Sequence, residues 1–208
     1  MPTRSRRPFR PTHRTTYLAP DEVPQPDPAP SVSFSELGLS APMLRTLDAV
    51  GYSDPTPIQA LTLPVALSGK DFVGQARTGS GKTAAFAVPI LEQLDRNSQT
   101  FQALVLCPTR ELAAQVTVEF ESLARGRSVQ ILTVVGGDPI RRQLDGLLAH
   151  PQVVVGTPGR VLDHLQRRTL SLRAIRFVVL DEADRMLDMG FAPDVERILL
   201  QTSKERQT

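Results

Sequence analysis

The chain reads Asp71-Phe72-Val73-Gly74-Gln75-Ala76-Arg77-Thr78-Gly79-Ser80-Gly81-Lys82-Thr83 and continues at once into an apolar segment that ends at Leu94. Residues 71–76 form a short apolar run bounded by turn residues, which predicts a buried strand. The glycine-rich loop behind them leads into residues 82–94, whose apolar content and length predict a helix. A strand, a glycine-rich loop and a helix in this order indicate an α/β fold.

The glycine-rich loop has the spacing of a phosphate-binding loop of the Walker A type. Its glycines let backbone amides turn toward phosphate oxygens, the helix N-terminus adds its positive end, and a lysine reaches the β and γ phosphates. The general pattern has glycine where this chain has Ala76, a small residue that still permits the turn. The alternative is a plain strand-to-helix turn whose lysine points to solvent. The predicted nucleotide contacts are Ala76, Thr78, Gly79, Ser80, Gly81, Lys82 and Thr83, and Thr83 is also a predicted magnesium ligand.

Short apolar runs alternate with amphipathic segments beyond this loop. Strands are predicted at residues 71–76, 103–107, 129–135, 152–156 and 175–180, and helices at 82–94, 111–124, 139–150 and 160–168. Repeated strand-then-helix units predict a doubly wound, mostly parallel sheet flanked by helices, in a single domain over residues 31–208. Ligands bind such sheets at the carboxyl ends of the strands, so the residues directly after each strand are the candidates for a site.

Two adjacent carboxylates follow the last predicted strand, in Asp181-Glu182-Ala183-Asp184. At that position Asp181 can hold Mg²⁺ and Glu182 can orient and deprotonate an attacking water. The alternative is an acidic helix start favoured by the helix dipole. Together with Lys82, the pair predicts a site for nucleotide hydrolysis, with Lys82, Asp181 and Glu182 as its catalytic residues.

The same four residues are the signature from which the DEAD-box RNA helicases of superfamily 2 take their name. The chain resembles the first, RecA-like domain of that family over about residues 34–208. The resemblance implies an ATP-dependent RNA helicase that uses ATP with Mg²⁺ and releases ADP. It also implies a role for Asp184 in coupling the motifs and the domains.

Residues 51–59, Gly-Tyr-Ser-Asp-Pro-Thr-Pro-Ile-Gln, resemble the family's Q motif. The resemblance implies that Gln59 bonds the adenine edge, that Phe34 stacks on the base and that Tyr52 belongs to the nucleotide site. An amide can accept from the exocyclic amine and donate to a ring nitrogen, which suits adenine and not guanine. Phe34 can alternatively be an ordinary packing aromatic. The same segment predicts a helix start with Thr56 as N-cap and a proline in the first helical position.

Three further segments follow predicted strands and match the family's RNA-contacting motifs Ia, GG and Ib. Each offers helix-N-terminal amides, a hydroxyl or glycines, groups suited to the RNA sugar-phosphate backbone and not to its bases. Each taken singly can also be a capped strand-to-helix turn. By resemblance, the predicted RNA-binding residues are Pro108, Thr109 and Arg110, then Gly136 and Gly137, then Thr157, Pro158, Gly159 and Arg160.

Charge and composition indicate a basic N-terminal arm and argue against a disulfide-rich, zinc-binding or membrane-spanning protein. The net charge of +2 is contributed by the arm of residues 1–30, which holds five arginines and eight of the 18 prolines. We expect this arm to be disordered, either as a phosphate tether for RNA or as a solubilising tail. The single cysteine and three scattered histidines argue against disulfides and structural zinc. With no run of about 20 apolar residues, we expect a soluble, cytoplasmic protein without a membrane partner.

Members of the family have a second domain beyond the acidic box. In the family a Ser-Ala-Thr motif follows the acidic box and a second RecA-like domain supplies arginine fingers, whereas no Ser-Ala-Thr follows Asp184 here. We therefore expect a monomeric first domain that lacks its partner domain, binds nucleotide and hydrolyses little of it. A GTPase is disfavoured because no Asn-Lys-x-Asp tetrad occurs. A DNA helicase and a non-enzymatic RNA clamp remain as alternatives, and competition between single-stranded RNA and DNA would separate RNA from DNA binding.

Overall fold

The structure is a computed structural model and describes residues 32–77 and 79–208. The predicted arm over residues 1–30, the first residue of the predicted domain and the predicted phosphate contact Thr78 lie outside the described residues. Among the residues described, no helix has the length and apolar character needed to cross a membrane.

A sheet of four parallel strands forms the centre of the fold. The strands are β1 (Ala103–Leu106), β2 (Ile131–Val134), β3 (Val153–Gly156) and β4 (Phe177–Leu180), in the spatial order β2-β3-β1-β4. β1 and β3 are buried along their whole length, which agrees with the Val- and Leu-rich runs that predicted them. Parallel pairing brings the carboxyl ends of all four strands to one edge of the sheet.

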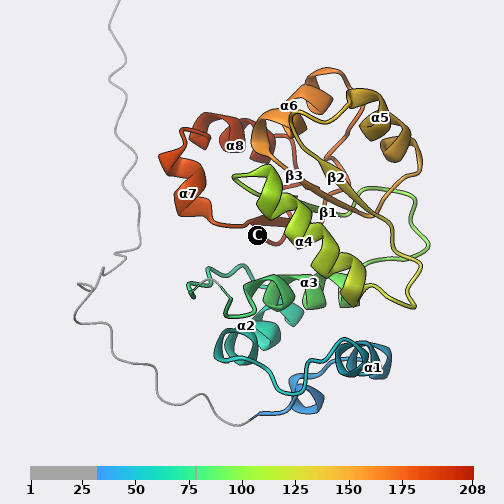
Figure 1. Ribbon diagram of the computed structural model, residues 1–208, viewed down its shortest axis with the longest axis vertical. Helices are drawn as coiled ribbons and strands as arrows, with labels where there is room; N and C mark the ends of the chain where they lie inside the picture. The colour runs from blue at the N-terminus through green and yellow to red at the C-terminus, as the bar shows by residue number, and fades with distance from the viewer. Residues whose placement is uncertain (1–31, 78) are drawn as a thin grey trace, which may run out of the picture.

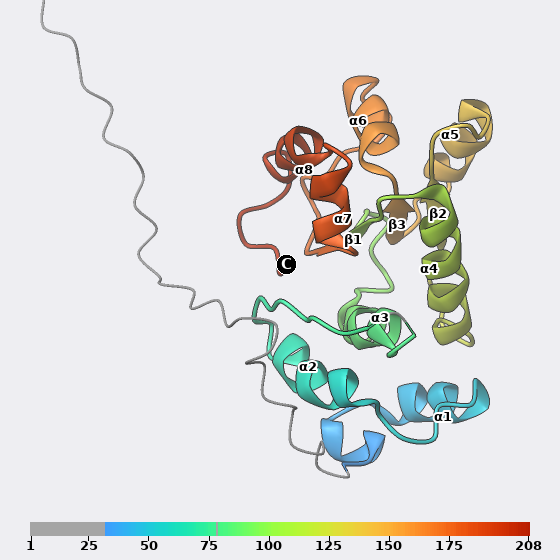
Figure 2. The same ribbon diagram turned by 60° about the vertical axis from the view of Figure 1, so that its left-hand side comes forward.

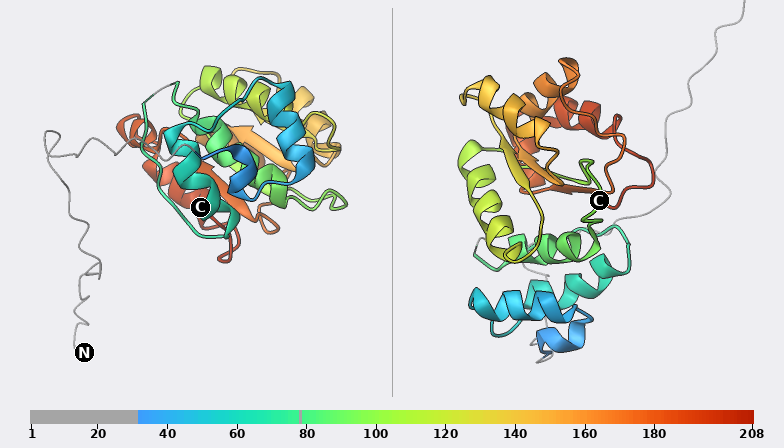
Figure 3. Two further views of the ribbon diagram at one scale, coloured as in Figure 1. Left: turned by 90° about the horizontal axis from the view of Figure 1, so that it is seen from below. Right: turned by 90° about the vertical axis from the view of Figure 1, so that its right-hand side faces the viewer.

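Helices cover both faces of this sheet (Figures 1 and 3). One hydrophobic cluster joins alternate strand residues such as Val105 and Val155 to α3 (Lys82–Gln93) and α4 (Arg110–Leu123). A second cluster joins the opposite alternation, such as Leu104 and Val154, to α5 (Ile140–Leu148), α6 (Pro158–Gln166), α7 (Ala183–Asp188) and α8 (Ala192–Leu199). The predicted doubly wound α/β fold is thereby confirmed.

The N-terminal helices add a further layer beyond α3, which Figures 1 and 2 show below the sheet. This layer holds the 3-10 helix η1 (Phe34–Leu37), α1 (Ala41–Ala49) and α2 (Pro57–Leu67). α2 begins as predicted, with Thr56 at the N-cap and Pro57 in the first helical position. The layer places the segment that resembles the Q motif beside the start of α3.

The predicted strand at residues 71–76 is wrong. These residues form no strand, and Val73 is 99% exposed. An apolar run becomes a strand only where a neighbouring strand offers its free edge. Here Gln207 makes a parallel bridge with Phe177 at the start of β4, and Val178 N–H donates to the Gln207 carbonyl at 2.9 Å. The segment instead touches the end of the chain, where Phe72 N–H donates to the Thr208 carbonyl at 3.2 Å.

The other predicted elements occur with shifted ends. The four remaining strands and four helices are present, each starting or stopping within about two residues of its predicted bounds. Helices α7 and α8 were not among the predicted elements. They are short, and together they follow the acidic pair at the end of β4.

Candidate active site

The phosphate-binding loop precedes α3 and turns on two glycines with positive φ, Gly79 at +80° and Gly81 at +82°. Gly81 is the N-cap of α3. The Lys82 ammonium donates to the Ala76 carbonyl at 2.7 Å, so the lysine closes the loop on itself. The Ser80 hydroxyl is buried and has no hydrogen-bond partner among the described residues. A buried polar atom without a partner inside this loop fits a loop that takes a polar ligand.

Gln59 braces the phosphate-binding loop from α2. It is fully buried; its Nε2 donates to the Gly81 carbonyl at 3.0 Å and its Oε1 accepts from Thr56 N–H at 2.9 Å. A side chain at position 81 would collide with this amide, so glycine is required there for space as well as for φ. One N–H and one lone pair of Gln59 remain for a ligand. Adenine recognition by Gln59 stays a prediction.

The acidic pair lies at the carboxyl end of β4. Asp181 N–H donates to the Leu106 carbonyl at 2.9 Å, which ties the pair to the central strand β1. Burial raises the pKa of Asp181, the neighbouring Glu182 raises it further, and Lys82 opposes both effects. Glu182 has φ 52° and ψ 52°, a left-handed conformation that costs energy for a residue with a side chain. Such strain is typical of functional sites.

A cavity of about 760 Å³ brings the phosphate-binding loop and the acidic pair onto one surface. Its lining includes Ala76 and Lys82 on one wall, and Asp181, Glu182 and Asp184 on the other. Arg185 contacts Glu182 with 3.1 Å between Nη1 and Oε2. The Asp184 carboxylate accepts from Arg185 N–H, at 2.9 Å, and stays exposed. The cavity therefore brings together three groups: Lys82, a cation that can bind phosphate; Asp181, a carboxylate that can bind a metal ion; and Glu182, a carboxylate that can bind a water molecule.

The donors near the cavity suit magnesium bound together with a nucleotide. The described residues contain no cluster of three or more His, Cys, Asp or Glu able to hold a metal ion by themselves. Mg²⁺ is commonly held by one or two carboxylates together with substrate phosphates. Asp181, with its buried carboxylate, and Thr83, with its hydroxyl, fit this arrangement.

The three predicted RNA-contacting segments meet at the same edge of the sheet, after β1, β2 and β3. Thr109 caps α4, accepting from Leu112 N–H at 3.2 Å, and Thr157 is the N-cap of α6. The exposed members of the predicted set are Arg110, Gly137 and Gly159; Thr109, Gly136, Thr157 and Arg160 are partly exposed; Pro108 and Pro158 are buried. Only the polar and glycine members of the predicted set are therefore accessible to a ligand at this edge.

Asp138 links these segments, although it was not among the site residues predicted from the sequence. Its carboxylate accepts from the Arg110 guanidinium at 2.6 Å, and its carbonyl accepts from Arg160 Nη1 at 3.2 Å. The available signal was an acidic residue directly after a glycine pair, next to two motifs that each carry an arginine. Asp138 thus connects the starts of α4 and α6 through the loop after β2.

A model of the DEAD/DEAH box helicase family matches residues 56–208. The chain belongs to this family. Among similar proteins, the ATP-dependent RNA helicase CshA of Listeria monocytogenes is 50% identical over 175 residues, which cover 84% of this chain and 34% of that protein. The protein of the same name from Limosilactobacillus reuteri is 50% identical over 177 residues, 85% of this chain and 36% of that protein. The DEAD-box chain spans about a third of the length of these relatives.

A solved structure supports the same fold for this DEAD-box chain. The crystal structure of a DEAD box protein from the hyperthermophile Methanococcus jannaschii matches with a TM-score of 0.81 and 45% sequence identity. The match covers 84% of this chain and 48% of the other. The predicted RecA-like domain of the DEAD-box resemblance is therefore confirmed at the level of the fold.

The two aromatics assigned to the DEAD-box nucleotide site lie in the N-terminal layer. Phe34 is 5% exposed and packs into the first hydrophobic cluster. Its ring meets Tyr52 edge-on, with 6.4 Å between the ring centroids. The Tyr52 hydroxyl donates to Glu119 on α4 at 2.7 Å, and burial together with Glu119 raises its pKa. Packing accounts for these contacts, and base stacking by Phe34 stays a prediction.

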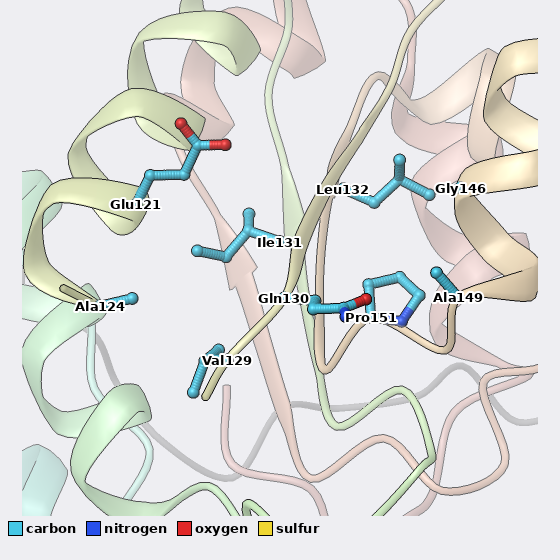
Figure 4. Close-up of a pocket in the computed structure, with 9 residues that line it drawn as sticks. All are labelled: Glu121, Ala124, Val129, Gln130, Ile131, Leu132, Gly146, Ala149 and Pro151. Atoms are coloured by element: carbon cyan, nitrogen blue, oxygen red, sulfur yellow. The ribbon is translucent and has the colours of Figure 1, made fainter. Parts of the chain in front are cut away.

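A second hollow of about 410 Å³ lies apart from the site of the DEAD-box domain, beside β2 (Figure 4). Figure 4 shows it between Glu121 and Ala124, at the end of α4, and Gly146 and Ala149, at the end of α5. Its floor, from Val129 to Leu132, is the segment that leads into β2 and its first two residues, away from the carboxyl end of the strand. The hollow is therefore separate from the phosphate and acidic residues.

Proposed function

We propose that the protein binds ATP with Mg²⁺ in the cavity between the phosphate-binding loop and the acidic pair, and binds the RNA backbone at the carboxyl edge of the sheet. In the whole protein, ATP hydrolysis drives local separation of RNA duplexes or remodelling of RNA–protein complexes. The observation that carries the proposal is the shared cavity of Lys82, Asp181 and Glu182. The relatives named ATP-dependent RNA helicases support it.

The nucleotide phosphates replace the Ala76 carbonyl as the hydrogen-bond partner of Lys82. Lys82 leaves the Ala76 carbonyl and donates to phosphate oxygens, while the amides that begin α3 donate from below. Asp181 and Thr83 would hold Mg²⁺, which neutralises phosphate charge when bound. Glu182 orients the attacking water and accepts its proton at Oε1, since Oε2 is paired with Arg185.

A measurement of ATP turnover tests how much of the proposed reaction is performed by residues 1–208 alone. The family resemblance assigns the arginine fingers to a second domain, and such a finger is worth about 10³ to 10⁵ in rate. We expect residues 1–208 alone to hydrolyse ATP near background with or without RNA, and to act as a monomer. Strong RNA-stimulated hydrolysis by these residues would contradict that expectation.

Binding experiments test the two ligands separately. We expect ADP to bind more tightly than GDP, because the amide of Gln59 suits the adenine edge. We expect single-stranded RNA to bind with an affinity that falls as salt rises, because the contacts are to phosphates. Equal binding of ADP and GDP would contradict the adenine site, and RNA affinity independent of salt would contradict backbone contact. A cytoplasmic location stays a prediction.

A further inference from the structure

A buried polar relay runs behind the loop that carries Gly136 and Gly137. The Gln143 side chain on α5 donates from Nε2 to the Val135 carbonyl at 2.9 Å. Its Oε1 lies 3.0 Å from Nε2 of His164 on α6, and Nδ1 of His164 lies 2.9 Å from the Thr169 hydroxyl. The relay therefore connects the end of β2, α5, α6 and the turn after α6.

The chemistry of the groups fixes the direction of both hydrogen bonds of Gln143. The Val135 carbonyl can only accept, so the amide nitrogen of Gln143 faces it and the amide oxygen faces His164. Since that oxygen can only accept, His164 donates from Nε2. In the neutral imidazole Nδ1 is then an acceptor, and the Thr169 hydroxyl shares its one proton between Nδ1 and the His164 carbonyl, which lies 3.1 Å away. Rotating the amide of Gln143 would set two acceptors against each other at the Val135 carbonyl.

Burial keeps Val135, Gln143 and His164 out of contact with solvent, whereas Thr169 is partly exposed. Gln143 is 3% exposed, Val135 is 3% exposed and His164 is fully buried. Burial lowers the pKa of His164, Arg160 and Arg167 lower it further, and Asp163 opposes them. The lowered pKa favours a neutral imidazole, and the bond to Gln143 places its proton on Nε2. None of these side chains can reach RNA, so any effect on RNA binding passes through the loop.

The outer end of the same loop is held by charge. Asp138 pairs with Arg110, both about half exposed, and its carbonyl accepts from Arg160. Gly137, with φ +82°, lies so close that a side chain there would collide with the Arg110 guanidinium. The loop from Val135 to Asp138 is thus fixed at its base by the relay and at its tip by two arginines of the neighbouring motifs.

We propose that Gln143 and His164 are positioning residues for RNA backbone binding: by fixing the Val135 carbonyl, they aim the amides of Gly136 and Gly137 and hold that loop in register with the start of α6. The inference rests on the proposed RNA binding and deepens it. Through Gln143 the loop and α6 move as one unit. Losing the relay lets the glycine amides turn away from a phosphate while the nucleotide cavity stays intact.

The test replaces Gln143 by methionine, which keeps the shape of the side chain and removes both hydrogen bonds. Gln102→Met is the matched control, because Gln102 is 2% exposed and uses both amide atoms on the backbone of Asp95, before β1. Measurements are the affinity for a single-stranded RNA at several salt concentrations, the affinity for ADP with Mg²⁺, and hydrogen exchange of the Gly136 and Gly137 amides.

We expect Gln143→Met to weaken RNA binding about tenfold, which corresponds to about 1.4 kcal/mol. The slope of log affinity against log salt should stay the same, because the lost contacts come from neutral amides and counterion release follows the contacts of Lys and Arg. Exchange at Gly136 and Gly137 should speed up, while ADP affinity stays within about twofold. Gln102→Met should leave RNA affinity and salt slope as in the unsubstituted protein. A purely structural role of Gln143 would lower ADP and RNA affinity together.

An unchanged RNA affinity in folded Gln143→Met would overturn the inference while leaving the proposed RNA binding intact. If the unsubstituted protein binds no RNA, the proposed function fails, and this inference fails with it. If Gln143→Met does not fold, Thr169→Val tests the effect of the relay on RNA affinity, because it removes only the hydroxyl beside His164. A loss of RNA affinity of about threefold supports the relay, and no loss overturns it.

Discussion

Replacing Gln59 with alanine removes the brace between α2 and the phosphate-binding loop. The side chain is fully buried, and it bonds Thr56 N–H, three residues before it, and the Gly81 carbonyl, 22 residues after it. Because Gly81 is the N-cap of α3, the change releases the start of the helix that carries Lys82. Both the stability of the domain and its affinity for nucleotide should fall.

The magnitude follows from the groups that are lost. Each hydrogen bond of this kind contributes about 1 kcal/mol net, so two contribute about 2 kcal/mol to the free energy of unfolding. The space left by a buried side chain adds to this cost. In a domain of this size, 1 kcal/mol shifts the unfolding midpoint by about 2–4 °C. Gln59→Ala should therefore lower the midpoint by at least about 4 °C.

The assay is thermal unfolding followed by circular dichroism, without nucleotide. Gln201→Ala is the control, because Gln201 is exposed and its side chain bonds only the neighbouring turn, at the Arg197 carbonyl. Gln59→Glu adds a sharper comparison, since a carboxylate can still accept from Thr56 N–H but cannot donate to the Gly81 carbonyl. Unfolding of Gln59→Ala at the same temperature as Gln201→Ala would refute the brace.

Two further changes probe the acidic pair and the core. Glu182→Gln should leave ADP affinity within about threefold and lower the rate of ATP hydrolysis in the whole protein by at least about 100-fold, as single-turnover kinetics would show; an unchanged rate would contradict its role toward water. Arg127→Met breaks a buried pair with Glu92, at 2.8 Å, and should cost about 3 kcal/mol or more at pH 7 in chemical denaturation. Burial raises the pKa of Glu92, but hydrogen bonds from Ser40 and Arg127 outweigh it and hold this pKa below the ordinary 4.5. The stabilisation is therefore present above pH 4.5 and is lost as the pH falls, so the effect of Arg127→Met should shrink in acid; a constant effect would contradict the pairing.

Local signals predicted most of the fold. The Val- and Leu-rich runs at β1 and β3 are buried on both faces, so composition alone marks them as strands. Thr56 and Pro57 predicted the start of α2 through capping chemistry that involves only neighbouring residues. The run at residues 71–76, Asp-Phe-Val-Gly-Gln-Ala, is less apolar, and a strand also needs a partner edge. Which edges are free is a property of the whole sheet and is not encoded within six residues.

The site shows the same division between local and distant information. Lys82, Asp181 and Glu182 were predicted because each follows a loop or strand with a recognisable pattern, and the cavity confirms that they share one surface. The bond of Lys82 to Ala76, the brace from Gln59 and the role of Asp138 were not predicted. The last two depend on contacts between residues more than 20 positions apart in the sequence.

The central claim is that the cavity between α3 and β4 binds a nucleotide through the ammonium of Lys82. Isothermal titration calorimetry of ADP with Mg²⁺ into the protein tests it most directly, with Lys82→Ala beside Lys70→Ala, whose lysine is exposed and outside the cavity lining. We expect the protein and Lys70→Ala to bind alike, and Lys82→Ala to bind at least about tenfold more weakly, since a charged hydrogen bond to phosphate contributes about 1.5–3 kcal/mol. Equal affinity of all three proteins, or no binding by the unsubstituted one, would contradict the account.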